Sequence, residues 1–480
     1  MNKLSSVSKF FKVNCQTEVD ILGISDDSRN IKRGYLFVAL PGINSHGITF
    51  VDDAISNGAV CILSDQPQSN NTDIPYIFYK DLKQKIAQFL FKFHDLDLNN
   101  FLFHGVTGTN GKTSTAFMAH QMVRKLEKPS CYIGTFGAII NDELITTKGN
   151  TTPGIFELCQ LLTIIRANQK TFIFLELSSH ALDQGRLSSL TFVQTMLLNI
   201  QSDHLDYHST LDKYIEAKLS ILTLSSLNTP LVFRDSFLVE SNTEIIKEKH
   251  KVQFISSKES SSPFLYTKQF NRDFHSKIAF QFPSFNSSVE VSLFPQFNLD
   301  NFACALGLIA NSFLASELEN IIYADIKLPP GRSELIKLAQ GHVFIDFAHD
   351  PEAMKNILSS LTESYDEILL IFGCGGDRDK EKRAKMMGVA EEFSHSIIFT
   401  SDNNRNESFE SIAADATQGS QFYNLTIIQS REEAIKQGLL SLNKSNILVI
   451  LGKGHEDAME EQGKSIPFND RECILKSARQ

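Results

Sequence analysis

Short apolar runs alternate with segments of helical periodicity along most of the chain, a pattern typical of α/β proteins. The clearest apolar run, residues 101–106, has the composition of a buried parallel strand. In residues 114–126, apolar side chains recur every three or four positions, which predicts a helix. The loop between them runs from Gly108 to Thr113. A strand, a glycine-containing loop and a helix in this order are the usual frame of a phosphate-binding loop.

The same pattern divides the chain of 480 residues into three predicted domains, residues 1–98, 99–330 and 331–480. The polar stretch 95–100 is the expected linker between the first two. The Pro-Pro-Gly sequence at 329–331 marks the second boundary, because these residues interrupt regular structure. We therefore expect a small α/β domain, a central domain with the phosphate-binding loop, and a C-terminal domain.

The first two domains contain further apolar runs that predict strands. Residues 240–295 are rich in Ser and Phe, which favours a peripheral β-rich section of the central domain. The remaining predicted elements are a helix at 51–57 and strands at 35–40, 59–63, 172–177 and 195–200.

The C-terminal domain alternates strands with helical segments, which predicts a doubly wound, Rossmann-like parallel sheet. The expected strands are residues 343–347, 368–372, 396–400, 426–429 and 447–451. Polar clusters follow three of them, at 377–379, 402–405 and 452–456. Ligands of such sheets bind beyond the carboxyl ends of the strands, so these clusters are candidate binding residues.

Composition narrows the class of protein. The formal net charge is −10 and no long basic block occurs, which argues against a nucleic-acid partner. The seven cysteines are scattered without metal-ligand spacing, which suits a reducing compartment. There is no signal-peptide pattern and no apolar run near the ~20 residues that span a bilayer. We expect a cytoplasmic protein without a membrane partner.

The predicted phosphate-binding loop assigns roles to individual residues. Lys112 would reach the terminal phosphates of a nucleotide, and the Thr113 hydroxyl would contact Mg²⁺. Val106 stands where the usual pattern has a glycine, so a structural glycine turn remains the alternative. The nucleotide-binding candidates here are Gly108, Thr109, Asn110, Gly111, Lys112, Thr113 and Ser114.

Two further residues are candidate ligands of a metal near this loop. Glu176 ends an otherwise apolar strand, where a carboxylate holds Mg²⁺ or caps a helix. His204 lies in a polar cluster, residues 203–208, and is either a metal ligand or a hydrogen-bonded core histidine. The cluster lacks the ligand spacing of a zinc site.

Lys218 falls on the apolar face of a helix predicted over residues 211–222, behind a capping pair formed by Ser209 and Asp212. A lysine in this place either extends its ammonium to the surface or is buried for a purpose. The first is the more common outcome. A buried lysine with a lowered pKa is open to chemical modification.

Three arginines are candidate ligand contacts. Arg332 follows the Pro-Pro-Gly boundary, where it contacts nucleotide from a hinge or lies on the surface. Arg378 and Arg405 lie beyond strands of the last domain, with Glu456 in a third cluster. Such a set suits a ligand with both carboxylate and amine groups, because arginine binds carboxylates in a bidentate manner. A surface network with Asp377, Asp379 and Glu407 is the alternative.

Taken together, these motifs resemble the Mur ligases, the ATP-dependent amino-acid-adding enzymes of peptidoglycan synthesis. The resemblance covers essentially the whole chain, and in this family the phosphate-binding loop is normally the shorter form found here. The matching segments are 107–113, 176–180, 199–208, Phe297 and Asn298 with Asn301, Gly331 with Arg332, and 346–349. A departure is Gln296, where relatives often carry glycine.

The resemblance implies specific ligands. Lys112, Glu176, His204 and Lys218 would be catalytic, with Thr113, Glu176, His204 and a carboxylated Lys218 at Mg²⁺, which reverses the preference for an exposed lysine. Asn298 and Arg332 would contact ATP. Ser28, within a segment like the uridine-site motif, would bind the UDP-MurNAc-dipeptide. The other positions that match dipeptide-binding residues are Asn150, Thr151, Thr152, Ser178, Gln184 and Arg186.

The resemblance is greatest to the diaminopimelate-adding members, in which a motif Asp-Asn-Pro-Arg reads the distal carboxylate. Here the motif is Asp402-Asn403-Asn404-Arg405, with Asn404 in place of proline, which frees the turn. Arg378, Gly452 and Glu456 also match that subfamily.

The expected reaction transfers the γ-phosphoryl group of ATP to the D-glutamate side-chain carboxylate, and the amine of the amino acid then attacks the acyl phosphate. We expect a monomer that acts on small-molecule substrates. The alternatives are the same ligation with lysine or another diamino acid, a folylpolyglutamate synthetase-like ligase, and a non-catalytic nucleotide-binding module.

Overall fold

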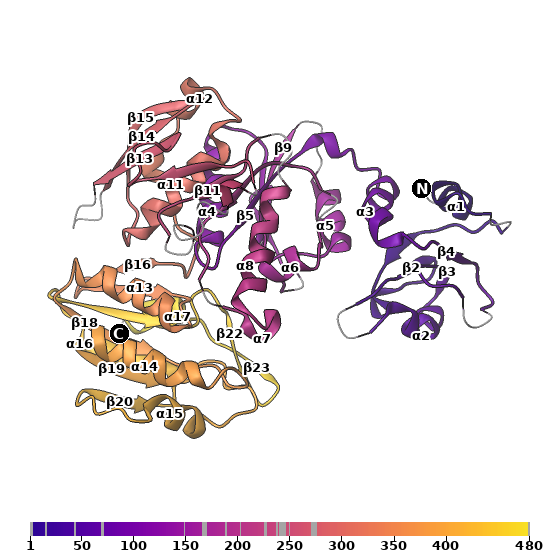
Figure 1. Ribbon diagram of the computed structural model, residues 1–480. Helices are drawn as coiled ribbons and strands as arrows, with labels where there is room; N and C mark the ends of the chain where they lie inside the picture. Colours follow the sequence, from indigo (N-terminus) through magenta and orange to yellow (C-terminus); the bar gives the residue numbers. More distant parts are fainter. Residues whose placement is uncertain are drawn as a thin grey trace.

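The computed structural model describes the chain except residues 1–2, 15–16, 43–44, 69–71, 148, 166–169, 188–189, 202, 225–227, 237–238, 240–245, 249, 270–275 and 479–480. The described residues form three successive α/β units, each built around its own sheet (Figure 1). The central unit lies between the other two. None of the described helices combines the length and apolar character needed to cross a membrane.

The first unit is a parallel sheet with strand order β1-β2-β3-β4. The predicted strands at 35–40 and 59–63 and the helix at 51–57 are confirmed as β2, β3 and α2. The elements are α1 (Leu4–Phe11), β1 (Gly23–Ser25), β2 (Tyr35–Ala39), α2 (Val51–Ser56), β3 (Ala59–Ser64), β4 (Tyr76–Phe78) and α3 (Leu82–Phe93).

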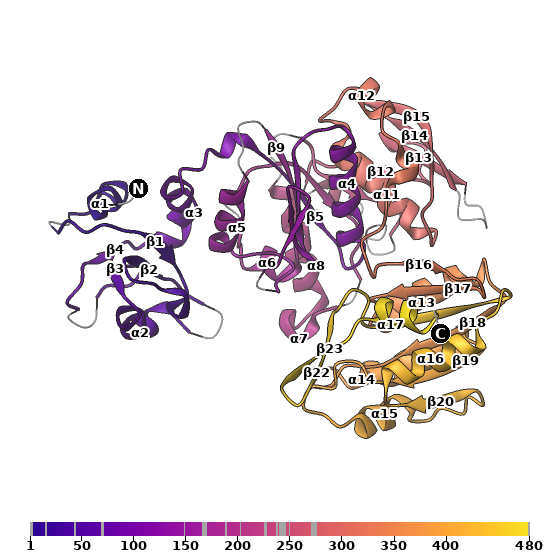
Figure 2. The ribbon, with the colours of Figure 1, turned by 180° about the vertical axis from the view of Figure 1, so that it is seen from behind.

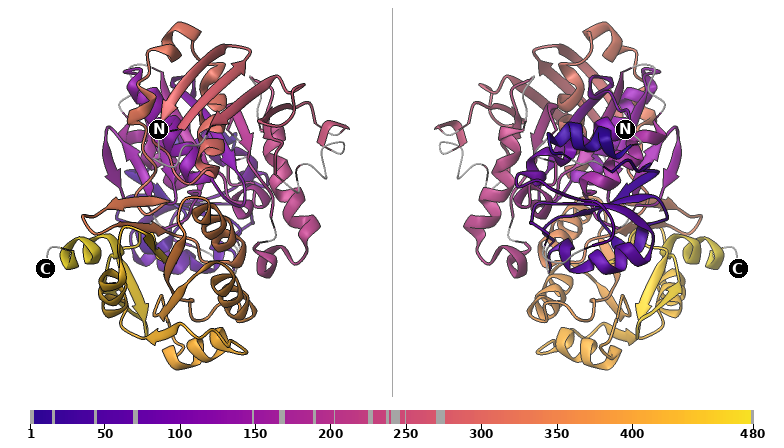
Figure 3. Two further views of the ribbon diagram at one scale, coloured as in Figure 1. Left: turned by 90° about the vertical axis from the view of Figure 1, so that its left-hand side faces the viewer. Right: turned by 90° about the vertical axis from the view of Figure 1, so that its right-hand side faces the viewer.

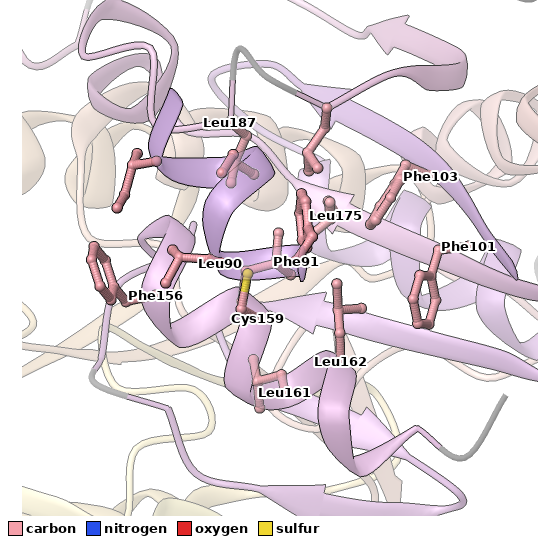
Figure 4. Packing of buried hydrophobic residues seen from close by; sticks show 14 of the residues in the cluster. Leu90, Phe91, Phe101, Phe103, Phe156, Cys159, Leu161, Leu162, Leu175 and Leu187 are labelled. Atoms are coloured by element: carbon pink, nitrogen blue, oxygen red, sulfur yellow. The ribbon is translucent and has the colours of Figure 1, made fainter. Parts of the chain in front are cut away.

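Helix α3 joins the first unit to the central one through a shared apolar core. Leu90 and Phe91 of α3 belong to the same buried cluster as Phe156 and Cys159 of α5 (Ile155–Ile164) (Figure 4). The two helices lie side by side in the view from behind (Figure 2). Strands of the central sheet complete this cluster with Phe101, Phe103 and Leu175. The hydrophobic effect therefore fastens the first unit to the central sheet.

The central sheet has eleven described strands in the order β15-β14-β13-β12-β11-β10-β5-β9-β6-β7-β8. The chain reaches β5 from α3 through a linker that ends in a short 3-10 turn, Leu98–Asn100. The strands are β5 (Phe101–Thr107), β6 (Ser130–Gly134), β7 (Gly137–Ile140), β8 (Glu143–Ile145), β9 (Thr171–Glu176), β10 (Phe192–Leu197), β11 (Leu231–Phe233), β12 (Gln253–Ser256), β13 (Phe264–Gln269), β14 (Ser276–Phe282) and β15 (Phe285–Val291).

Strand β5 lies between β10 and β9 and runs parallel to both. The prediction of a strand at 195–200 was displaced, because β10 ends at Leu197 and the next apolar residues begin a loop. The predicted β-rich section at 240–295 is confirmed by β12 to β15, which continue the central sheet and form one end of it. The main helices are α4 (Lys112–Lys125), α5, α6 (Ser179–Asp183), α7 (Leu205–His208), α8 (Leu211–Leu219), α11 (Phe297–Ala310) and α12 (Ala315–Glu319).

The C-terminal sheet has the order β16-β17-β21-β18-β19-β20 and is parallel except for the edge strand β16. The five predicted strands are confirmed as β17 to β21. Its strands are β16 (Glu334–Lys337), β17 (His342–Asp346), β18 (Glu367–Phe372), β19 (Ser396–Thr400), β20 (Leu425–Ile428) and β21 (Asn446–Leu451), and a hairpin adds β22 (Ala458–Glu461) and β23 (Lys464–Pro467).

Helices cover both faces of this sheet, which confirms the doubly wound fold (Figure 3). Strand β21 shows why: Ile447, Val449 and Leu451 belong to one buried cluster, and Leu448 and Ile450 to another. Alternate side chains of a strand point to opposite faces, so a strand covered on both must be apolar throughout. The helices are α13 (Pro351–Thr362), α14 (Glu381–Phe393) and α15 (Phe409–Thr417) on one face, and α16 (Arg431–Ser441) and α17 (Asp470–Ser477) on the other.

A fully buried ion pair fixes the carboxyl ends of this sheet. The guanidinium of Arg431 on α16 donates to both carboxylate oxygens of Asp470 on α17, at 2.7 and 2.8 Å. It also donates to the carbonyls of Leu451 at 3.0 Å and Ser401 at 3.3 Å. These two carbonyls immediately precede the polar clusters at 402–405 and 452–456. The pair therefore positions both clusters as well as the two helices.

We expect Asp470→Ala to lower the free energy of unfolding of the C-terminal sheet by about 3–5 kcal/mol, because it leaves a buried guanidinium without its counter-ion. Urea denaturation followed by circular dichroism would measure the change. Glu472→Ala, an exposed change on the same helix, is the control and should alter stability by less than about 0.5 kcal/mol. Equal effects of the two substitutions would contradict this role of the pair.

Candidate active site

The predicted phosphate-binding loop connects β5 to the first turn of α4. Gly111 precedes the helix in a left-handed conformation, with φ of 84°, which glycine adopts without strain. The backbone N–H groups at this helix start are available to an anion. The Nζ of Lys112 donates to the carbonyls of Gly108 at 2.7 Å and Thr109 at 2.9 Å, so the lysine lies back over its own loop.

The segment after β10 holds the loop in shape. The backbone N–H of Asn110 donates to Asn199 Oδ1 at 2.9 Å, and Asn199 Nδ2 returns a bond to the Asn110 carbonyl at 3.0 Å. Asn110 Nδ2 donates to Gln201 Oε1 at 2.6 Å. Gln201 was not identified from the sequence as a contact of this loop, because the contact depends on β10 lying beside β5.

Glu176 is completely buried at the end of β9, next to the loop. It accepts hydrogen bonds from the Thr113 hydroxyl at 2.9 Å, from Thr135 N–H at 3.0 Å and Oγ1 at 3.1 Å, and from the Tyr132 hydroxyl. Burial and the adjacent Glu176 raise the pKa of Tyr132 well above its ordinary value, which keeps its proton on the phenol. Sequence reasoning missed Tyr132 and Thr135, which come from β6 and the turn after it.

Lys218 is buried in α8, with 1% of its surface exposed, so the alternative in which its ammonium extends to the surface is wrong. Helix α8 begins at the expected residue, Leu211, but its cap differs: Thr210, rather than Ser209, caps it by accepting the N–H of Lys213. The buried residues of α8 are Tyr214, Ala217 and Lys218, so Lys218 lies on the helix face that meets the core.

The amine of Lys218 lies 4.8 Å from the ring centre of Tyr214, and no carboxylate among the described residues pairs with it. Burial lowers the pKa of Lys218 well below its ordinary value, and the nearby charge of Lys112 lowers it further. The Tyr214 hydroxyl is 2.9 Å from Thr109 Oγ1, so this tyrosine connects the lysine with the phosphate-binding loop.

His204 is half exposed, so the alternative of a core histidine is wrong. Its Nε2 lies 3.4 Å from Asp203 Oδ2, and its φ of 52° places it in the left-handed region. Lys382 of α14 approaches Asp203 to 3.8 Å and links the C-terminal sheet to this loop. Burial raises the pKa of Asp203, but His204 and Lys382 together bring it below its ordinary value.

A second group of predicted residues surrounds the start of α6. Thr152 Oγ1 donates to the backbone carbonyl of Glu176 at 2.8 Å and accepts the N–H of Ser178 at 2.9 Å. Arg186 donates to the Thr152 carbonyl at 2.9 Å and to Gln184 Oε1 at 2.7 Å. Thr151 and Asn150 lie on the same turn as Thr152, Asn150 being exposed. The structure thus brings this polar group next to the Glu176 end of β9.

Arg332 and Asn298, the two predicted ATP contacts outside the loop, have different surroundings. The Arg332 guanidinium lies 4.4 Å from the ring centre of Phe347, within a row of rings that continues through His455 to Phe136 of the central unit. Asn298 is buried at the start of α11 and accepts a bond from Asn301 Nδ2 at 3.0 Å. Asn301 packs so closely on Gly111 that any side chain at that glycine would collide with it.

The C-terminal clusters converge at one end of their sheet. Arg378 and Arg405 both lie beside Gly375. A β-carbon at this glycine would lie 3.6 Å from Arg378 Cγ and 3.0 Å from Arg405 Nη1. Asn403 Nδ2 donates to Glu456 Oε2 at 2.9 Å, which joins two of the clusters. This convergence agrees with the expected ligand site beyond the strand ends.

The other members of the clusters, Gly452, Asp402 and Asn404, are held by close packing and hydrogen bonds. Gly452 has a φ of 110° and lies against the Asp402 carboxylate, which leaves no room for a side chain. Asp402 accepts the N–H of Asn403 at 2.6 Å. Asn404, which replaces the expected proline, is buried and donates to Ser401 Oγ at 3.3 Å. Asn404 thus replaces the rigidity of a proline ring with a hydrogen bond to the strand end.

Ser28 does not join these groups. It is buried at the start of a 3-10 turn, Ser28–Asn30, in the first unit, where its carbonyl accepts a bond from Asn57. The central unit separates the first unit from the C-terminal sheet (Figure 1).

The donor set around Glu176 fits a hard divalent cation. Its neighbours are oxygen donors, which Mg²⁺ prefers. The described residues contain no group of three His, Cys, Asp or Glu side chains that could hold a metal. A cation at Glu176 would therefore need Thr113, substrate oxygens or a carboxylate formed on Lys218 to complete its coordination.

Comparison with known proteins gives matches along the whole chain. Three family models match, the Mur ligase family catalytic domain at residues 20–93, the Mur ligase middle domain at 106–309, and the Mur ligase glutamate ligase domain at 331–454.

Several relatives of similar length carry the name UDP-N-acetylmuramoyl-L-alanyl-D-glutamate--2,6-diaminopimelate ligase. The relative from Fusobacterium nucleatum is 33% identical over 96% of this chain and 94% of its own. The one from Buchnera aphidicola is 36% identical over 95% and 93%. A solved structure of a ligase of the same name is 27% identical, covers 98% of both chains and has a TM-score of 0.68. The chain therefore belongs to the Mur ligase family.

Proposed function

We propose that the chain catalyses the ATP-dependent addition of meso-2,6-diaminopimelate to UDP-MurNAc-L-Ala-D-Glu, a step in peptidoglycan precursor synthesis. One observation carries this proposal: the phosphate-binding loop, buried Glu176 and buried Lys218 occur in one chain with the Arg378 and Arg405 cluster. The first three suit phosphoryl transfer from ATP, and the last suits an amino acid with a second carboxylate. The relatives of full length support the same activity.

Each unit has its own task in this proposal. Residues 1–98 bind the UDP part of the dipeptide substrate, with Ser28 in that site. Residues 99–330 bind ATP and hold the dipeptide at the turn of Thr151 and Thr152. Residues 331–480 bind the amino acid. We further propose that the protein works as a monomer in the cytoplasm.

Phosphoryl transfer places the γ-phosphate beside the D-glutamate carboxylate, so two anions must approach each other. When ATP binds, Lys112 would stop donating to the carbonyls of Gly108 and Thr109 and would donate to the phosphate oxygens. The backbone N–H groups at the start of α4 would point at the same phosphate. Arg332 adds a cation from the C-terminal unit. Burial lowers the pKa of Lys112, and the charge of Arg332 acts in the same direction. These groups stabilise the charge on the transferring phosphoryl group.

Thr113, Glu176, His204 and carboxylated Lys218 are the residues proposed to hold Mg²⁺. When bound, the metal would neutralise phosphate charge and orient the phosphate oxygens. The lowered pKa of Lys218 favours the neutral amine, which is the form that combines with CO₂ to give a carbamate. The carbamate would turn a buried, unpaired cation into an oxygen ligand.

Amide formation then depends on orientation and on exclusion of water. Thr152, Ser178, Gln184 and Arg186 form one hydrogen-bonded group that would hold the dipeptide in place next to Glu176. Arg405 and Arg378 would hold the distal end of diaminopimelate, so that its amine faces the acyl phosphate. Attack of the amine releases phosphate. Closure of the C-terminal unit against the central one would protect the acyl phosphate from hydrolysis.

Amino-acid choice is the most direct test of the proposal. With UDP-MurNAc-L-Ala-D-Glu and ATP, we expect phosphate release with diaminopimelate to exceed that with lysine by at least about 100-fold in kcat/KM, because lysine lacks the carboxylate that Arg405 would bind. Faster turnover with lysine would overturn the amino-acid assignment. ATP hydrolysis that responds to a folate substrate and not to the UDP-dipeptide would support the folylpolyglutamate alternative.

Lys112→Ala should reduce kcat/KM for ATP by roughly 10²- to 10³-fold, because the transferring phosphoryl group loses a charged donor. Steady-state phosphate release would measure this. Lys128→Ala, an exposed change beyond the end of α4, is the matched control. Unchanged ATP turnover in Lys112→Ala would favour a non-catalytic nucleotide-binding module.

Lys218→Ala should reduce activity by more than about 10-fold, because the metal site loses an oxygen ligand. Acetate or propionate should restore part of this activity by filling the cavity with a carboxylate. Lys213→Ala, on the exposed side of the same helix, should change neither activity nor the response to carboxylates. Full activity of Lys218→Ala without added carboxylate would refute the carbamate.

A further inference from the structure

Arg405 is already paired with a carboxylate of its own chain. Its Nε lies 3.2 Å from Oε2 of Glu460, on strand β22 of the C-terminal hairpin. We propose that Glu460 is an internal competitor for the amino acid, which occupies the carboxylate-binding edge of Arg405 until a distal carboxylate displaces it and so lowers the affinity for that ligand. This inference rests on the proposed function, because it concerns the same amino-acid site.

The remaining contacts of Arg405 define which edge of its guanidinium can bind substrate. Nη1 donates to the Gly376 carbonyl at 2.8 Å and lies 3.4 Å from the Asn403 carbonyl. These contacts hold the side chain against the backbone of Gly375. The edge formed by Nε and Nη2 is the one that can accept a carboxylate side-on, with two parallel hydrogen bonds. Glu460 occupies the Nε end of that edge.

The backbone keeps Glu460 at this place. Its N–H donates to Asn403 Oδ1 at 2.9 Å, and its carbonyl accepts the N–H of Arg405 at 2.9 Å. The Arg405 carbonyl accepts the N–H of Gln462 in turn. Only the Glu460 side chain is loosely held, with 59% of its surface exposed. Its carboxylate can therefore turn into solvent without breaking the backbone contacts.

Glu456, a further carboxylate of the site, has hydrogen-bond partners other than Arg405. Its Oε2 accepts hydrogen bonds from Lys453 Nζ at 2.7 Å and from Asn403 Nδ2 at 2.9 Å. Lys453 is fully buried and also donates to the Ala458 carbonyl at the start of β22 at 2.7 Å. Lys453 thus balances the charge of Glu456, whereas the charge of Glu460 is balanced by Arg405.

This exchange of partners affects amino acids differently. A distal carboxylate replaces the Glu460 carboxylate on Arg405, so one ion pair is made and one is lost. A distal ammonium without a carboxylate, as in lysine, cannot make this replacement. Glu460 therefore weakens binding of every ligand that uses Arg405, and it keeps Arg405 neutralised when such a ligand is absent.

Glu460→Gln tests the proposal because it removes the competing charge and keeps the side-chain shape. We expect the KM for diaminopimelate to fall about two- to fivefold, the effect typical of a partly exposed ion pair, while kcat and the KM for ATP stay unchanged. The kcat/KM for lysine should not rise. In an Arg405→Lys background, where bidentate binding is lost, Glu460→Gln should no longer lower the KM for diaminopimelate.

Glu461→Gln is the matched control, since it removes the same charge from the adjacent position of β22, where side chains point to the opposite face. A fall in KM with both variants would show a general charge effect and overturn the proposal. So would an unchanged or increased KM with Glu460→Gln, the increase meaning that Glu460 binds the distal ammonium. Absence of diaminopimelate-dependent turnover in the unmodified protein is a separate result, which refutes the proposed function itself.

Discussion

The buried carboxylate of Glu176 is the constraint on which the candidate site depends. A carboxylate removed from water is costly unless hydrogen bonds compensate it. Here they come from Thr113 at the start of α4, from Tyr132 in β6 and from Thr135 just after it, while the Glu176 carbonyl accepts a bond from Thr152. One residue thus fixes the relative positions of the phosphate-binding loop, a neighbouring turn and the proposed dipeptide site. A metal that binds there finds its surroundings already arranged.

The C-terminal sheet also contains a buried charged group, in this case a cation. Arg431 is buried behind the strand ends, and Asp470 with two backbone carbonyls satisfies its donors. The cation therefore serves architecture, while Arg378 and Arg405, in front of the strand ends, keep a partly open position. Because the buried arginine stabilises the fold and the accessible arginines remain available to a ligand, one sheet edge can be both rigid and able to bind anions.

The sequence was sufficient for the parts of the fold that depend on local pattern. The phosphate-binding loop and the five parallel strands of the last sheet follow from apolar runs and glycine chemistry. The hairpin β22–β23 could not be found in this way, because its side chains are mostly exposed and carry no apolar pattern. The continuation of the central sheet through β12 to β15 depends on long-range pairing, which local composition does not encode.

In the candidate site, too, some residues could be predicted from local pattern and others depend on tertiary structure. Residues with an unusual place in a pattern, such as Lys218 on an apolar face, were identified, although whether the amine was buried could be decided only by the surrounding elements. Tyr132, Gln201 and Glu460 carry no such signal. Their importance arises from the partner that tertiary structure brings to them, namely Glu176, Asn110 and Arg405.

The shared core of α3 and α5 has a consequence for how the molecule can move. Since Leu90 and Phe91 pack into the apolar surface of the central sheet, separating the first unit would expose Phe156 and its neighbours to water. The C-terminal sheet also shares apolar contacts with the central unit, because Phe294 lies in the buried cluster of Phe344. Two further contacts join these units, Phe136 with His455 and Asp203 with Lys382. Movement of the first unit away from the central sheet would therefore cost the hydrophobic free energy of the cluster that α3 and α5 share.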